Sequence, residues 1–63
     1  MSSLYPVDNL HEASQCRNTR KNEIVSPVAP LLEDESVWVV EDESGNLYLE
    51  YERNLTDYGR WGE

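Results

Sequence analysis

The sequence predicts a small α+β protein, in which a β-hairpin packs with a short helix near the N-terminus. Two strand-like runs rich in Val, Leu and aromatic residues flank a Gly-containing turn between residues 36 and 53, which is typical of a hairpin. A helix start signal and a sparse apolar stripe precede them at residues 9–20. At 63 residues the chain is long enough for a single domain only, residues 1–63, with the hairpin as its core.

The N-terminal part predicts a flexible lead-in, residues 1–7, followed by the helix. Asp8 can begin this helix, because its carboxylate can accept a hydrogen bond from a free amide of the first turn. The apolar stripe would consist of Leu10, Ala13 and Cys16. The helix is short, and Asn18 and Thr19 are poor helix formers, so we expect it to depend on packing against the hairpin.

A segment with two prolines, residues 24–32, joins the helix to the hairpin. Pro27 and Pro30 forbid a regular helix and disfavour a central strand, because proline has no backbone donor. We therefore expect an extended connector laid across the hairpin. The alternative is an extended peptide that docks into a groove of a partner.

The hairpin strands are predicted at about residues 36–41 and 46–53. If Gly45 takes the left-handed position of a three-residue turn, Val40 faces Tyr48. One face then carries Val37, Val39, Leu47, Leu49 and Tyr51, and the other carries Trp38, Val40, Tyr48 and Glu50. A two-stranded ribbon that is apolar on both sides is not stable alone. We expect the first face to form the core and the second to contact a partner.

The net charge of −8 belongs entirely to the second half of the chain. Residues 1–32 contain three acidic and three basic residues, whereas residues 33–63 contain ten acidic and two basic residues. Such a field attracts cationic partners and repels nucleic acid and anionic membranes. We therefore expect a protein partner with a basic surface, and no direct contact with nucleic acid or membrane.

The residue pattern does not predict catalysis, a cofactor or a metal site. His11 and Cys16 are five residues apart and do not share a helical face. The acidic runs at 33–35 and 41–43 lack the alternating ligand spacing of a calcium loop. The chain has no apolar run of membrane-spanning length and no signal-peptide pattern, so we expect a cytoplasmic protein. The small core and single cysteine leave a partner, a homodimer or partial disorder as alternatives, of which we favour a partner or a homodimer.

One local stretch, within about residues 42–58, suggests a family. It reads Gly45-x-x-Tyr48-x-Glu50-Tyr51-x-Arg53-x-Leu55-Thr56-Asp57-Tyr58 after an acidic turn. This pattern is similar to the hairpin region of small phage-encoded inhibitors of uracil-DNA glycosylase, although the longer helix that follows the hairpin in that family is missing here. The resemblance implies a viral, acidic, dimeric β-sheet protein that occupies the DNA groove of an enzyme as a DNA mimic.

We predict a small acidic protein-binding module, an inhibitor or adaptor that docks its hairpin on a basic surface, with DNA mimicry as one form of that docking. The alternative is an accessory or assembly subunit that folds into a larger complex through its Pro-rich apolar segment and its aromatic tail. The predicted partner-binding residues are Trp38, Val40, Glu41, Asp42, Glu43, Tyr48, Glu50, Glu52, Tyr58 and Trp61.

Overall fold

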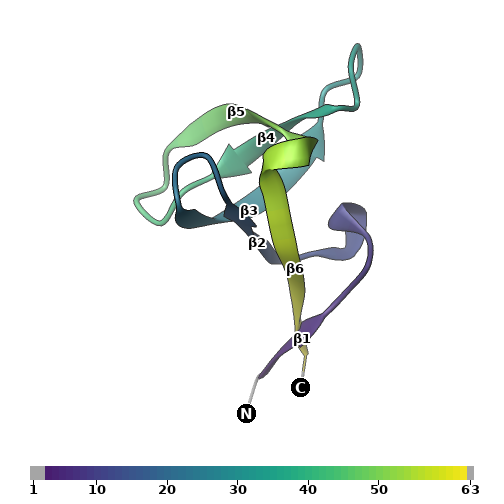
Figure 1. Cartoon of the computed structure of the whole chain (residues 1–63), viewed down its shortest axis with the longest axis vertical. Helices are drawn as coiled ribbons and strands as arrows, with labels where there is room; N and C mark the ends of the chain where they lie inside the picture. Colours follow the sequence, from purple (N-terminus) through teal and green to yellow (C-terminus); the bar gives the residue numbers. More distant parts are fainter. Residues whose placement is uncertain (1–2, 63) are drawn as a thin grey trace.

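Six antiparallel strands form one continuous sheet in a computed structural model that describes residues 3–62 (Figure 1). The order across the sheet is β1-β6-β2-β3-β4-β5. Two short 3₁₀ helices, η1 and η2, complete the described chain. The elements are β1 (Ser3–Pro6), η1 (Leu10–Glu12), β2 (Gln15–Asn18), β3 (Glu23–Pro30), β4 (Val37–Glu41), β5 (Leu47–Tyr51), η2 (Glu52–Asn54) and β6 (Leu55–Gly62).

The predicted α+β class is wrong, because no α-helix occurs anywhere in residues 3–62. Only Leu10–Glu12 is helical within the range predicted for a helix, and Asn9 rather than Asp8 caps it by accepting a bond from the His11 amide at 2.9 Å. The chain then enters β2, which pairs with both β3 and β6. Pairing on two sides buries Cys16 and Asn18, and this tertiary gain exceeds a weak local helix preference.

The proline-containing segment is extended, as predicted, but it is a strand inside the sheet rather than a connector across it. Residues 23–25 of β3 pair with β2, and residues 26–30 pair with β4. Pro27 and Pro30 therefore stand where β3 has a single neighbour, and a register shift follows Pro27. A proline costs no sheet hydrogen bond on an unpaired side or at a bulge, which explains why this strand tolerates two of them.

The predicted hairpin is confirmed as β4 and β5, and Val40 is opposite Tyr48 as expected. Gly45 has a φ of +87°, the left-handed conformation that glycine adopts without strain. The turn closes through the Asp42 amide, which donates to the Asn46 carbonyl at 2.9 Å. The second strand ends at Tyr51, and the residues after it form η2 instead of continuing the strand to residue 53.

The two ends of the chain pair with each other, because β6 lies between β1 and β2 (Figure 1). The segment predicted as a flexible lead-in, residues 1–7, contains β1, while residues 1–2 lie outside the described part of the chain. Gly59 allows this pairing, since a Cβ there would come within 2.9 Å of the Leu4 side chain.

The core lies between the β3–β4–β5 part of the sheet on one side and η1, β2 and β6 on the other. It consists of Leu10, Cys16, Val25, Trp38, Val40 and Leu55, with Ala13, Tyr48 and Tyr58 packed against it. The His11 ring meets the edge of the Trp38 ring at a centroid distance of 4.9 Å. None of the helices in the described residues is both long and apolar enough to cross a membrane.

Candidate functional site

The hairpin has an inner face, formed by Trp38, Val40, Tyr48 and Glu50, and this face lies against the core. Trp38 and Glu50 are buried, and Val40 is completely inaccessible to solvent. The prediction that this face is exposed for a partner is therefore wrong. The physical reason is that η1, β2 and β6 supply Leu10, Cys16 and Leu55, which cover it.

A buried carboxylate, Glu50, is the centre of a polar cluster beside this core. Its Oε1 atom accepts from Asn18 Nδ2 and Arg20 Nε, both at 2.8 Å, and forms an ion pair with Arg20. Its Oε2 atom accepts from Asn54 Nδ2 at 2.8 Å and from the Tyr51 amide at 3.2 Å. Burial raises the pKa of this carboxyl group, but the hydrogen bonds from Arg20, Asn54 and Asn18 outweigh burial and hold the pKa at about 2.

The same cluster continues through Tyr48. Its hydroxyl accepts from Asn18 Nδ2 at 2.9 Å and donates to Glu23 Oε2 at 2.6 Å, and Lys21 lies 4.1 Å from the centre of its ring. Burial, together with the Glu23 carboxylate, raises the pKa of Tyr48 to about 12. Within residues 3–62, no buried side-chain nitrogen or oxygen is left without a hydrogen bond. A cluster satisfied in this way holds the fold together, and none of its buried polar atoms needs a ligand as a partner.

The opposite side of the hairpin is exposed. We call it the outer face, and it consists of Val37, Val39, Leu47, Leu49 and Tyr51. Leu47 is 62% exposed, Leu49 54% and Tyr51 46%, and all three come from β5. Their cross-strand neighbours on β4 are half-buried, because Val39 lies opposite Leu49 and Val37 lies opposite Tyr51. The face predicted to be the core is thus an apolar surface in contact with water.

Carboxylates surround the outer face on several sides. Glu41 lies opposite Leu47 at one end of the hairpin, Glu43 is in the turn, and Glu52 follows β5 at the other end; all three are exposed. Residues 33–35 add three more exposed carboxylates in the loop before β4. The Arg53 guanidinium, 4.2 Å from the Tyr51 ring centre, is a nearby positive charge. An apolar patch with a charged rim is the usual arrangement of a protein-binding surface.

The remaining predicted residues are separated by the fold. Asp42 is half-buried, and its Oδ1 atom accepts from the amides of Ser44 and Asn46, both at 2.9 Å, so it stabilises the turn. The hydrogen bond from Asn46 holds the pKa of the Asp42 carboxyl group below its usual value. Tyr58 is half-buried against the core, whereas Trp61 is exposed on β6 opposite Leu4.

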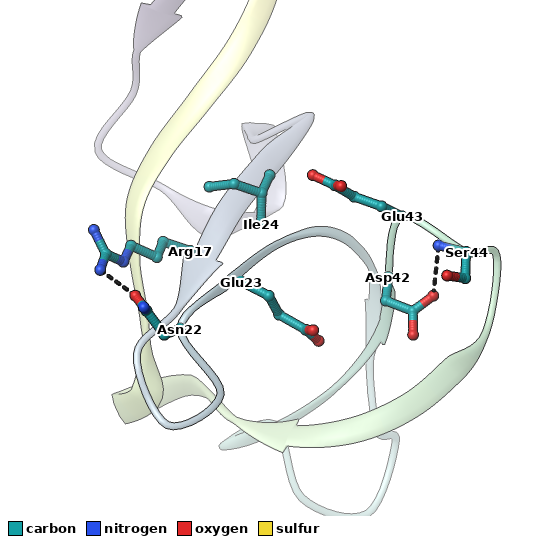
Figure 2. Close-up of a pocket in the computed structure, with 7 residues that line it drawn as sticks. All are labelled: Arg17, Asn22, Glu23, Ile24, Asp42, Glu43 and Ser44. Atoms are coloured by element: carbon teal, nitrogen blue, oxygen red, sulfur yellow. Dashed lines mark hydrogen bonds between the residues drawn. The ribbon is translucent and has the colours of Figure 1, made fainter.

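An open cleft of about 570 Å³ lies between the β2–β3 turn and the β4–β5 turn (Figure 2). Its walls include the carboxylates of Glu23, Asp42 and Glu43, and Arg17 bonds to Asn22 at one end. Two of these carboxylates already accept bonds within the fold, from Tyr48 and from the turn amides. The outer face is therefore the stronger candidate for a functional site.

The sequence did not single out Leu47, Leu49 and Tyr51 as the exposed apolar residues of the hairpin. No local signal could have selected them, because both faces of the hairpin are apolar and alternate with the same period of two. Searches of protein-family models, curated protein sequences and solved structures returned no match to this chain. The resemblance to glycosylase inhibitors therefore stays a prediction.

Proposed function

We propose that this chain is a small acidic protein-binding module, an inhibitor or adaptor that contacts its partner through the outer face of the hairpin. The exposure of three large apolar side chains side by side on β5 carries the proposal. A sheet normally packs such a face against another layer. No element among residues 3–62 covers this one, so it is available to another protein.

Charge defines the partner. The rim carboxylates and the net charge of −8 disfavour an acidic partner and attract a basic one. The partner surface would therefore combine an apolar patch for Leu47 and Leu49 with lysine or arginine side chains that reach Glu41, Glu43 or Glu52. The apolar contact supplies affinity, and the charges supply steering and orientation.

DNA mimicry is the narrower form of this proposal. It is supported by the exposed carboxylates of the turn and of residues 33–35. Glu50 would not take part in the mimicry, because it is buried and paired with Arg20. If the chain acts in this way, duplex DNA competes for the partner and added salt weakens the complex. If neither duplex DNA nor salt weakens the complex, DNA mimicry is excluded, and an adaptor or an accessory subunit remains as the function.

The test is capture of a partner by the immobilised chain, followed by measurement of Kd with the purified partner. We expect Leu49→Ser to weaken binding roughly tenfold, corresponding to about 1.4 kcal/mol. Leu4→Ser is the matched control, because Leu4 is also an exposed leucine but lies on β1, at the opposite edge of the sheet. Equal Kd values for wild type, Leu49→Ser and Leu4→Ser would rule out the outer face as the contact.

A further inference from the structure

The free edge of β5 has backbone groups that point away from the sheet. In an antiparallel pair, alternate residues exchange both hydrogen bonds with their neighbour, and the residues between them direct their amide and carbonyl outward. The Asp42 amide donates to the Asn46 carbonyl, and the Glu52 amide donates to the Ser36 carbonyl at 2.8 Å. Hydrogen-bonded pairs recur at every second residue of the hairpin, and these two bonds lie at its two ends. Tyr48 and Glu50, in phase with both, are therefore the residues of β5 that are hydrogen-bonded to β4.

The residues between these positions are Leu47, Leu49 and Tyr51, so their amides and carbonyls lie on the free edge. The Tyr51 amide is already used, because it donates to Glu50 Oε2 at 3.2 Å. The amides of Leu47 and Leu49 remain as outward donors, since β5 is the last strand of the described sheet. These two residues also carry the most exposed side chains of the outer face.

The other edge of the sheet, β1, is protected in a way that β5 is not. β1 has only four residues and ends in Pro6, and both features discourage a further strand from pairing there. β5 has five residues without proline or lysine, and its single charge, Glu50, is turned inward and paired. An exposed, apolar and unprotected edge is a template for an added strand.

Resting on the function proposed above, we propose that β5 binds an extended segment of a basic partner as a seventh strand. The added strand would place apolar side chains beside Leu47, Leu49 and Tyr51 at alternate positions, and main-chain hydrogen bonds to Leu47 and Leu49 would hold it. Lysine or arginine at its ends would meet Glu43 and Glu52, which lie beyond the two ends of β5.

Charge makes a second copy of this chain the wrong occupant. Antiparallel pairing of two β5 strands about Leu49 would put the turn that contains Glu43 of one copy beside Glu52 of the other. Each copy also has a net charge of −8. Like charges at neighbouring strand positions are destabilising, and a basic segment reverses the sign of each of these contacts.

The experiment measures amide hydrogen exchange in the full chain with a synthetic peptide that has arginine at both ends and valine alternating with threonine between them. We expect the Leu47 and Leu49 amides to become protected by roughly tenfold or more at saturating peptide. The Tyr48 and Glu50 amides are internal controls, because their bonds to β4 protect them with or without the peptide. A peptide with glutamate in place of both arginines should give much less protection.

The outcomes separate this inference from the proposed function. If the methyl signals of Leu47 and Leu49 shift but their amides stay unprotected, the outer face binds the peptide without strand addition, and the inference fails while the function stands. Protection that equals that of the glutamate peptide, or no protection up to millimolar peptide, also overturns it. Concentration-dependent protection without peptide, together with a dimer in sedimentation, would show that a second copy occupies the edge.

Discussion

The two faces of the β4–β5 hairpin contain similar apolar side chains, but one face is buried and the other is exposed. The inner face has Trp38 and Val40 from β4, and the outer face has Val37 and Val39 from the same strand. The first pair is buried, and the second is partly open to water. The difference comes from what packs on each side, because η1, β2 and β6 converge on the inner face and leave the outer face uncovered. An apolar face is therefore a surface that has to be covered, and the rest of the fold decides whether the chain itself or another protein covers it.

The largest expected effect comes from removing the carboxylate at the centre of the inner polar cluster. Glu50→Ala removes an acceptor from Asn18 and from Asn54, and we expect a loss of about 2–4 kcal/mol in the free energy of unfolding. That is a large part of the stability expected of a chain of this length, roughly 3–9 kcal/mol. Urea unfolding followed by circular dichroism measures it. The exposed Glu52→Ala is the control and should change stability by less than about 0.5 kcal/mol.

The next effect compares two neighbouring valines of β4 that point to opposite faces. Val40→Ala opens a cavity in the core and should cost about 2 kcal/mol, whereas Val39→Ala on the outer face should cost less than about 1 kcal/mol. The same urea experiment measures both variants. Equal costs would mean that the outer face is also covered in solution, for instance by a second copy.

Acid should weaken the inner face through Glu50. Its folded pKa of about 2 lies below the ordinary value of 4.5, so the ionised carboxylate stabilises the fold above pH 4.5, and this contribution is lost as the pH falls from 4.5 towards 2. Thermal unfolding across this range should show a falling Tm. Glu50→Gln should remove a clear part of that fall, and an unchanged pH profile in this variant would contradict the assignment to Glu50.

The smallest expected effect concerns the rim of the outer face. Glu41→Gln combined with Glu52→Gln should weaken partner binding by roughly twofold to fivefold and flatten its salt dependence, because exposed ion pairs contribute only about 0.2–1 kcal/mol each. Calorimetric titration at two salt concentrations measures this. Asp8→Asn combined with Glu12→Gln is the charge-matched control, because it also removes two exposed carboxylates, just before and within η1. If that variant loses as much affinity, the charges act through the total field rather than at the rim.

The hairpin was predictable because its signals are local. Gly45 provides the left-handed turn, and the flanking runs have strong strand preference, so the register of Val40 with Tyr48 follows. The N-terminal region was predicted wrongly, since residues 15–18 have weak local preferences and become a strand only by pairing with β3 and β6. Asn18 illustrates the point, because a poor helix former is here a fully buried donor to Glu50 and Tyr48.

The sequence by itself determined the hairpin, its register, the two sets of side chains on its faces and the confinement of the net charge to the second half of the chain. These properties depend on neighbouring residues and on side-chain counts. The tertiary structure alone decided which set of side chains is buried, because burial depends on where η1, β2 and β6 pack, and these elements are distant in sequence from the hairpin. It thereby moved the expected contact from the Trp38 side to Leu47, Leu49 and Tyr51, and within residues 3–62 it left the β5 edge unpaired.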